Sequence, residues 1–381
     1  MDLWNKTNNL MAVFLSTDRN PNTNYVLTKT NSSEAVLFYF VTYISTAINL
    51  ILSSLGATAN IINIIVYWRL GISESVNASF ISLAVWTLIS CCLSCLSEII
   101  QAVDKFAPLA DVNLLSLQYV YLGNTKAFFY VMMTFVTVYL SAERCICIIF
   151  PLKVKEIFTS RRVIIANTVV VLFGISCFTP AWATQGVQWT FDVGTNRTRL
   201  DIWVSDNRRD VELFVDACNG MALPVLAQIL ILVCTGFMLQ GISDSTKFRQ
   251  RYTKKETPRR GLNSREDVCP AEIKANIIKR TTIMSGKDLK LTKIVVLLAM
   301  IFFVCNLPVF ISSFLRALIT EIRVNKQHNK LHALLYSLVL EFGVINCTVN
   351  ILVYYNVSSR YRHEFLMLFS RSGFTRDHNL H

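Results

Sequence analysis

Seven apolar runs, each long enough to cross a bilayer as a helix, follow one another along the chain with polar stretches between them. About 20 apolar residues in an α-helix span the hydrocarbon core, and the backbone there must be bonded within its own element, which favours helices. The runs cover residues 36–68, 77–103, 115–148, 161–184, 211–241, 290–318 and 332–355. The sequence therefore predicts an all-α membrane protein, a seven-transmembrane helix bundle.

Composition agrees with this assignment, because 53% of the residues are hydrophobic and only 16% are charged. Such a chain cannot cover an ordinary water-facing surface. We expect three parts: a tail at 1–35, the bundle at 36–355 with a polar loop at 243–287, and a short amphipathic helix with a tail at 356–381. None of the other segments is long enough to bury a core of its own.

Basic residues set the expected orientation, because they collect in loops that stay in the cytosol. We therefore place the N-terminal tail outside and the C-terminal tail in the cytoplasm of a multi-pass plasma-membrane protein. The net charge of +12 lies mostly in these loops, which favours contact with the membrane surface and with partners over nucleic-acid binding. The basic residues after the third and fifth runs are Lys153, Lys155, Arg161, Arg162, Lys247, Arg249, Arg251, Lys254, Lys255, Arg259 and Arg260.

Asn-x-Ser/Thr triplets on the expected outer side predict N-glycosylation at Asn5, Asn31 and Asn196. Each triplet is a weak signal, because such short patterns occur by chance. Further triplets fall in or beside the apolar runs, and we expect them to stay unmodified; they begin at Asn77, Asn346 and Asn356.

The eleven cysteines do not form a disulfide or zinc pattern. Nine fall within the apolar runs, where they are expected to act as small packing residues. Cys218 and Cys269 are expected on opposite sides of the membrane and cannot pair. Neither paired catalytic groups nor metal-ligand spacing is evident, so we expect no metal site, no cofactor and no enzyme activity.

Short motifs recur in a fixed order along the runs. They are Asn60; Asn77 with Leu83 and Ala84; Glu143-Arg144-Cys145; Pro224; Phe302, Cys305 and Pro308; Asn346, Asn350 and Tyr354; and Tyr361, Arg362 and Phe365. In this order they resemble the rhodopsin-like (class A) G protein-coupled receptors over about residues 52–369. Residues 350–362 and 151–159 are similar to an invertebrate branch that contains molluscan chemosensory and neuropeptide-receptor-like sequences.

The resemblance implies a receptor that senses an extracellular small molecule or peptide and activates a heterotrimeric G protein by outward movement of the sixth helix. A chemosensory role is the first expectation and a neuropeptide receptor is the alternative. Arrestin and receptor kinases are implied as partners of loop 243–287. A transporter is disfavoured because no repeated halves are visible. An uncoupled receptor stays open, because the family pattern is altered at Thr87, Leu232, Asn306 and Ile351.

The expected switch centres on Arg144, because a guanidinium at a buried bundle end needs an acidic partner. We predict that it contacts Glu143 and Asp288 in the inactive state, and that Pro308 lets the sixth helix bend. Anchoring of Arg144 to lipid headgroups is the alternative, and Asp288 also fits a solvated charge run. The resemblance assigns Asn350 and Tyr354 to the same switch.

Three departures from the family pattern carry expectations of their own. Thr87 stands where the family keeps a sodium-binding aspartate, so a sodium site is not expected. Asn306 replaces a tryptophan, and its amide is expected to bond across helices, with Asn346 or Asn350 as an equal alternative. Tyr119 stands where most members have a disulfide cysteine, so loop 185–210 is expected to be unstapled and more mobile.

Charges inside the membrane are costly and are therefore candidates for function. Lys126 and Glu341 are expected at similar depths, roughly 15 Å from the outer surface at 1.5 Å per residue, with Glu98 nearer that surface. A bridge that only satisfies these charges and a ligand that competes with it both remain open. Lys126 disfavours a monoamine, because the amine receptors have an aspartate there. Further candidates for contact with an acidic molecule or a peptide C-terminus are Tyr130, Asn124 and Arg316.

Overall fold

The computed structural model describes residues 32–107, 109, 111–150, 158–192, 196–256, 286–318 and 329–377. Helices dominate this part of the chain, and two of them begin with short π-helical stretches, labelled η. The elements are α2 (Ser32–Leu70), α3 (Ser75–Phe106), α4 (Leu114–Leu117), η1 (Gln118–Gly123), α5 (Asn124–Ile149), α7 (Ser160–Ala183), β1 (Gln185–Asp192), β2 (Arg197–Val204), α8 (Arg208–Val215), η2 (Asp216–Ala222), α9 (Leu223–Glu256), α11 (Gly286–Leu318), α12 (Asn329–Val357) and α13 (Ser359–Asp377).

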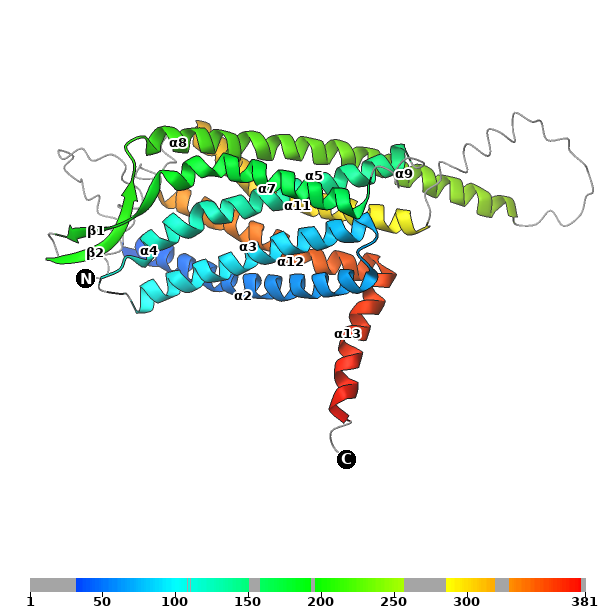
Figure 1. The fold of residues 1–381 in the computed structure, drawn as a ribbon, viewed down its shortest axis with the longest axis horizontal. Coiled ribbons are helices and arrows are strands. Elements are labelled where there is room, and N and C mark those ends of the chain that lie inside the picture. The colour runs from blue at the N-terminus through cyan, green and yellow to red at the C-terminus, as the bar shows by residue number, and fades with distance from the viewer. Residues whose placement is uncertain are drawn as a thin grey trace, which may run out of the picture.

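The long helices lie side by side in one bundle, with a β-hairpin at one end and α13 turned away from the bundle axis at the other (Figure 1). We call these the hairpin end and the α13 end. Among the described residues, seven helical spans are long and apolar enough to cross a membrane. The predicted fold class is confirmed. The third span runs continuously through α4, η1 and α5.

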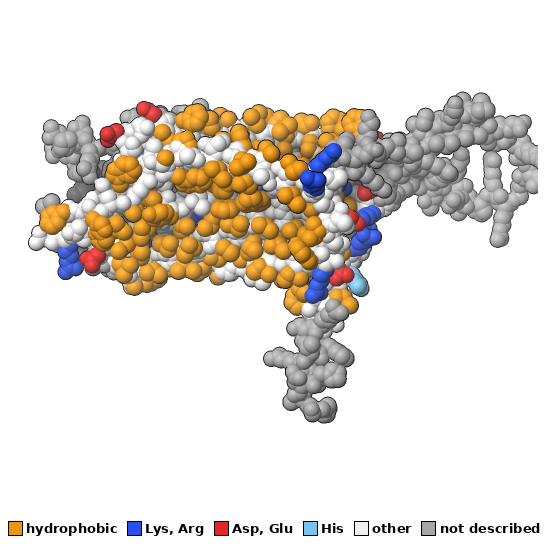
Figure 2. Space-filling model, in the orientation of Figure 1, with side chains coloured by type: hydrophobic (Ala, Val, Ile, Leu, Met, Phe, Trp, Pro, Cys, Tyr) orange, Lys and Arg blue, Asp and Glu red, His pale blue; other side chains and the backbone are white. Residues whose placement is uncertain are grey.

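Apolar side chains cover the flank of the bundle, while charged side chains gather at its two ends (Figure 2). Large residues that would be buried in a soluble protein are exposed here, among them Ile164 and Leu172 of α7, which are 64% and 63% exposed. Since lipid tails are the only solvent that such a surface matches, the chain is a multi-pass membrane protein.

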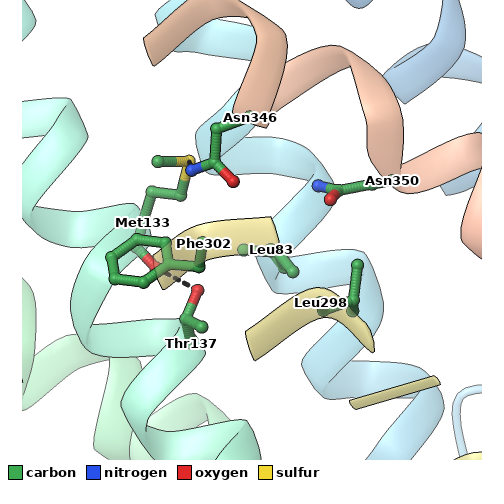
Figure 3. A pocket seen from close by; sticks show the side chains of 7 residues that line it. All are labelled: Leu83, Met133, Thr137, Leu298, Phe302, Asn346 and Asn350. Carbon is green, nitrogen blue, oxygen red and sulfur yellow. Dashed lines mark hydrogen bonds between the residues drawn. The ribbon is translucent and has the colours of Figure 1, made fainter. Parts of the chain in front are cut away.

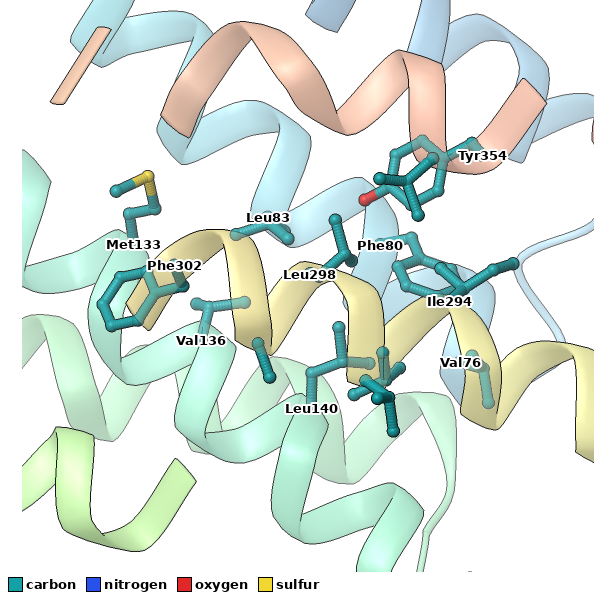
Figure 4. Packing of buried hydrophobic residues seen from close by; sticks show 14 of the residues in the cluster. Val76, Phe80, Leu83, Met133, Val136, Leu140, Ile294, Leu298, Phe302 and Tyr354 are labelled. Carbon is teal, nitrogen blue, oxygen red and sulfur yellow. The ribbon is translucent and has the colours of Figure 1, made fainter. Parts of the chain in front are cut away.

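The core of the bundle is largest toward the α13 end, where α11 packs between α3, α5 and α12. Phe80, Leu140, Ile294 and Tyr354 come from these four helices and are at most 1% exposed (Figure 4). The cluster continues onto α13 through Tyr361, which is fully buried. This contact fixes where α13 leaves the bundle.

Loop 185–210, which we expected to be a mobile loop without a staple, contains an antiparallel hairpin. Strands β1 and β2 pair over eight residues each, from Gln185 opposite Val204 to Asp192 opposite Arg197. Aromatic and β-branched residues are frequent in both strands, which favours pairing. Asn196, beside the turn, has a positive φ of 51°, a conformation that asparagine tolerates better than most residues. An all-α description therefore omits this hairpin.

Candidate functional site

Arg144 and Glu143 form a buried ion pair near the α13 end of α5. Nη2 of Arg144 lies 3.1 Å from Oε1 of Glu143, and the two side chains are 4% and 0% exposed. This is the first of the two contacts predicted for Arg144. An unpaired buried guanidinium would be strongly destabilising, so the carboxylate compensates for the loss of water. Nε of Arg144 has no hydrogen-bond partner among the described residues.

Two serines of α3 hold the carboxylate of Glu143 in place. Ser75 Oγ donates to Oε1 at 2.6 Å, and Ser79 Oγ donates to Oε2 at 3.0 Å. With Arg144, the carboxylate accepts three hydrogen bonds, and the ion pair is thereby fixed to α3. Sequence reasoning missed both serines. Their four-residue spacing puts them on one helix face, but it does not say which helix that face meets.

The second predicted contact of Arg144, to Asp288, is not formed. No ion pair of 4.0 Å or less joins these two residues in the structure. Asp288 is exposed at the start of α11, whereas Arg144 is buried. The neighbouring Lys287 pairs instead with Glu74, just before α3. The buried guanidinium of Arg144 is paired with Glu143 in this conformation.

A chain of hydrogen bonds runs through the centre of the bundle from α3 to α13. Thr87 Oγ1 donates to Asn60 Oδ1 at 2.8 Å, and Asn60 Nδ2 donates to the carbonyl of Cys347 at 2.9 Å. Asn63 Nδ2 also donates to Asn60 Oδ1, at 3.3 Å, and Tyr361 Oη donates to Asn63 Oδ1. Burial raises the pKa of Tyr361, so its hydroxyl stays a neutral donor at physiological pH. The chain ties four helices together.

Asn306, which replaces the family's tryptophan, bonds to Tyr130. Tyr130 Oη donates to Asn306 Oδ1 at 2.6 Å, and Asn306 Nδ2 donates to the carbonyl of Phe302 at 2.7 Å. The predicted bond across helices is thus present, while the alternative partners Asn346 and Asn350 are not used. A candidate ligand residue on α5 is joined directly to α11, two residues before Pro308.

A small cavity lies below this bond, lined by Leu83, Met133, Thr137, Leu298, Phe302, Asn346 and Asn350 (Figure 3). Its volume is about 10 Å³, close to what one water molecule needs. Thr137 Oγ1 bonds to the Met133 carbonyl at 2.9 Å. Tyr354 lies farther along α12, packed against Tyr67 and Tyr361, with ring centroids 5.0 and 5.5 Å away.

The charged residues toward the hairpin end are arranged differently from the prediction. Glu341 accepts a hydrogen bond from Ser45 Oγ at 2.7 Å, and no ion pair of 4.0 Å or less joins Lys126 to Glu341 or to Glu98 among the described residues. Glu98 is 3% exposed, and its carboxylate interacts electrostatically with Lys126. Lys126 and Lys105 are the cations that act on Glu98. The expected bridge between α5 and α12 is therefore absent, because Glu341 bonds to α2.

The remaining predicted residues lie apart from these contacts. Asn124 is half-buried at the start of α5. Arg316 belongs to α11, but its side chain lies outside the described part of the chain, as do Asn5 and Asn31. Asn196 is exposed next to the hairpin turn.

Hydrogen bonds hold the hairpin on the bundle. Asp201 accepts bonds from Ser116 Oγ at 2.6 Å and Asn113 Nδ2 at 3.2 Å. Gln185 Nε2 donates to the carbonyl of Val120 at 2.7 Å, and Arg208 Nη1 donates to that of Ala181 at 2.6 Å. These contacts tie the segment to α4, η1 and α7 without a disulfide, because the described cysteines are all free thiols.

A comparison with known protein families shows to which family this bundle belongs. The sequence profile described as 7 transmembrane receptor (rhodopsin family) matches residues 59–354. The chain belongs to the rhodopsin family. That match covers α3 to α11 and most of α12, and so includes the ion pair of Arg144 and the polar residues of the bundle centre. A search of curated proteins found no match.

Thr87, for which no sodium site is expected, lies among neutral groups in the centre of the bundle. Its hydroxyl is used by Asn60 and by backbone carbonyls of its own helix. Cys347, whose carbonyl accepts a bond from Asn60, has its sulfur atom 3.7 Å from that of Met133 in the same core. Hydroxyl and sulfur groups carry no charge to offset a sodium ion, which prefers oxygen ligands of the hard type.

Proposed function

We propose that this receptor senses an extracellular ligand and activates a heterotrimeric G protein by outward movement of α11. The observation that carries the proposal is the buried Arg144–Glu143 pair at the α13 end, within the segment matched by the rhodopsin family. Nε of Arg144 has no hydrogen-bond partner among the described residues. It can therefore donate a hydrogen bond to a carbonyl group of a partner protein. Pro308 lies within α11 and leaves the carbonyl of Val304 without its helix donor, so the helix can bend at this level.

In this proposal, the α13 end faces the cytosol of a cell whose plasma membrane holds the receptor. Exposed basic side chains at that end support the orientation, among them Arg161 and Lys247, since basic residues are retained on the cytosolic side. The hairpin with Asn196 then faces outward. A peptide-N-glycosidase shift that is smaller in Asn196→Gln than in the wild type would support this topology, and a glycan on Asn77 would overturn it.

The coupling test compares Arg144→Ala with Arg161→Ala, an exposed arginine at the same end of the bundle. Arg144→Ala removes a charged side chain that donates hydrogen bonds to the G protein in this proposal. Its loss should lower guanine-nucleotide exchange about tenfold or more. Membranes with equal surface levels of each variant are assayed with representatives of each G protein class. Unchanged exchange in Arg144→Ala would remove the arginine from coupling. Silence of the wild type with every class would favour the uncoupled alternative.

We further propose that the ligand presents an acidic group to Lys126, as expected of a chemosensory receptor for small acids. Lys126 interacts with the carboxylate of Glu98 and shares it with Lys105, which also interacts with Asp104, while Glu341 bonds to Ser45. A ligand carboxylate can therefore pair with Lys126, which has no carboxylate of its own among the described residues. A neuropeptide with a free C-terminus has the same group and is the second candidate. The exposed Trp189 and Phe191 of the hairpin favour a peptide by offering it apolar contact area.

A panel of carboxylic acids, their amides and peptides with free or amidated C-termini tests this ligand class. Activation by the acids alone, lost in Lys126→Gln and partly kept in Lys126→Arg, would support it. The matched control is Lys105→Gln, because Lys105 is also near Glu98 but lies over the ring of Tyr43, 4.7 Å from the ring centroid. Activation by amines or amides would show that Lys126 is satisfied within the protein.

A further inference from the structure

The start of α11 is bonded to two elements that are distant in sequence. Lys287 Nζ forms an ion pair with Glu74 Oε1, just before α3, and Lys290 Nζ donates to Ser359 Oγ, at the start of α13, at 3.1 Å. These contacts cross 213 and 69 residues of chain. Both contacts join α11 to its neighbours at the α13 end, where no ion pair of 4.0 Å or less joins Arg144 to Asp288.

The turn that carries Glu74 is itself firmly anchored. We call residues Gly71–Ser75 the α2–α3 turn. Gly71 has a φ of 96°, which a residue with a Cβ rarely adopts. Asn77 Nδ2 donates to the Gly71 carbonyl at 2.9 Å, and Ser160 Oγ of α7 donates to the Ile72 carbonyl at 2.7 Å. The turn therefore presents Glu74 from a fixed position.

The same turn also reaches the arginine of α5. Ser75, next to Glu74, donates at 2.6 Å to the carboxylate of Glu143, which bonds to Arg144. One short segment thus bonds to α5 through Ser75, to α7 through Ile72 and to α11 through Glu74. Because a turn bonded to both α5 and α7 cannot follow α11 outward, movement of that helix must break the Lys287 contact.

We propose that the α2–α3 turn is the latch that holds α11 closed, through Glu74 and Lys287, in place of the predicted ion pair between Arg144 and Asp288. The effect of the latch on signalling rests on the proposed coupling function. Its effect on the position of α11 does not, because that position belongs to the receptor alone. Glu74 and Lys287 side chains are each 40% exposed. The latch is therefore weak and sensitive to salt, as suits a contact that opens in every activation cycle.

Charge reversal with restoration tests the latch. Lys287→Glu and Glu74→Lys each place like charges in contact, and the double variant restores an opposite pair. Each single variant should raise basal nucleotide exchange about two- to fivefold, as expected when an exposed ion pair is lost, and the double variant should return it to the wild-type level. Lys247→Glu is the matched control, an exposed lysine on α9 at the same end; Glu74→Lys should not correct any change that it causes.

A distance measurement separates the latch from G protein coupling. Spin labels are attached at the exposed positions Arg69 and Lys293, through non-canonical amino acids because the chain has eleven cysteines. The distance between them should increase in both single variants and return in the double variant. If distances change as expected but exchange stays silent with every G protein class, the latch stands and the coupling proposal fails. Unchanged distances in the single variants, or an equal change in Lys247→Glu, would overturn the latch.

Discussion

The charged side chains at the two ends of the bundle differ in how they are bonded. At the α13 end, Glu143 accepts three hydrogen bonds and Lys287 pairs with Glu74. At the hairpin end, Lys126 and Glu98 lie inside the bundle with no ion pair of 4.0 Å or less among the described residues. The carboxylate of Glu143 at the α13 end is thus bonded within the protein. Lys126 at the hairpin end has no such close partner among the described residues, and the proposed contact with an acidic ligand group rests on this difference.

This difference also affects how much stability a single substitution should cost at each end. Removing one partner of a buried ion pair is costly, while a buried charge without a close partner already lowers stability and can be removed at little cost. The comparison therefore predicts large losses from single substitutions at the α13 end and small ones at Lys126.

The largest effect is expected for Glu143→Ala, which leaves Arg144 buried without its carboxylate. Breaking a buried pair in this way costs about 3–5 kcal/mol, measured by thermal unfolding of the purified receptor. Glu143→Gln is the milder comparison, because its amide oxygen keeps one of the two acceptor positions, while its NH2 group cannot accept the bond from the other serine. A loss below 1 kcal/mol in the alanine variant, on the scale of an exposed pair, would remove the contrast between the two ends.

The next effect is expected at the hairpin itself, in Asp201→Ala. Loss of the acceptor for Ser116 and Asn113 should cost about 1.5–3 kcal/mol of local stability, because the bonds involve a charged group. Hydrogen exchange of the Leu200 amide, which bonds to the Asp111 carbonyl at 2.9 Å, should accelerate accordingly. Asp206→Ala, an exposed acid on the same side of the bundle, should leave that amide unchanged. Equal protection in both variants would show that the strands hold without Asp201.

A smaller effect is expected for Tyr130→Phe, which removes the bond to Asn306 between the two ends. Hydrogen bonds of this type within membranes contribute about 0.6–1.7 kcal/mol. Basal nucleotide exchange should rise about three- to fifteenfold if the bond favours the closed position of α11. Tyr139→Phe, on the same helix, should match the wild type. A fall in exchange would assign the bond to the open state instead.

The smallest effect on stability is expected for Lys126→Met, which keeps the chain length of the side chain and removes its charge. The melting temperature should stay the same or rise, corresponding to a change within about 1 kcal/mol, while the response to acids is lost. Comparison with Glu143→Ala in the same thermal assay sharpens the contrast between the ends. A destabilisation as large as that of Glu143→Ala would show that Lys126 is a structural partner of Glu98.

The helices could be predicted from the sequence because bilayer thickness sets a length that apolar runs must reach. The predicted run 115–148 differs by one residue at each end from the observed span Leu114–Ile149. Prediction was poorer for the hairpin, since its strands alternate over only eight residues and the tyrosine in place of a cysteine suggested a loose loop. The hydrogen bonds of Asp201 and Gln185 involve partners that sequence spacing cannot reveal.

The polar residues were found more readily than their partners. Arg144, Asn306 and Lys126 were selected because polar or charged groups inside a membrane are rare and costly. Which group each one meets depends on helix rotation and tilt, which packing decides. Equal depth suggested Glu341 for Lys126, yet Ser45 holds that carboxylate. Arg144 is buried whereas Asp288 is exposed, and only the tertiary structure shows this difference.

The hydrogen-bonded attachment of the hairpin has a consequence for how the receptor is made. The hairpin segment needs no oxidative step to reach the arrangement described, because the bonds of Asp201, Gln185 and Arg208 form between ordinary polar groups. Biosynthesis can then proceed without disulfide isomerases acting on this segment. Cell-free translation into lipid discs under reducing conditions should yield the hairpin correctly attached.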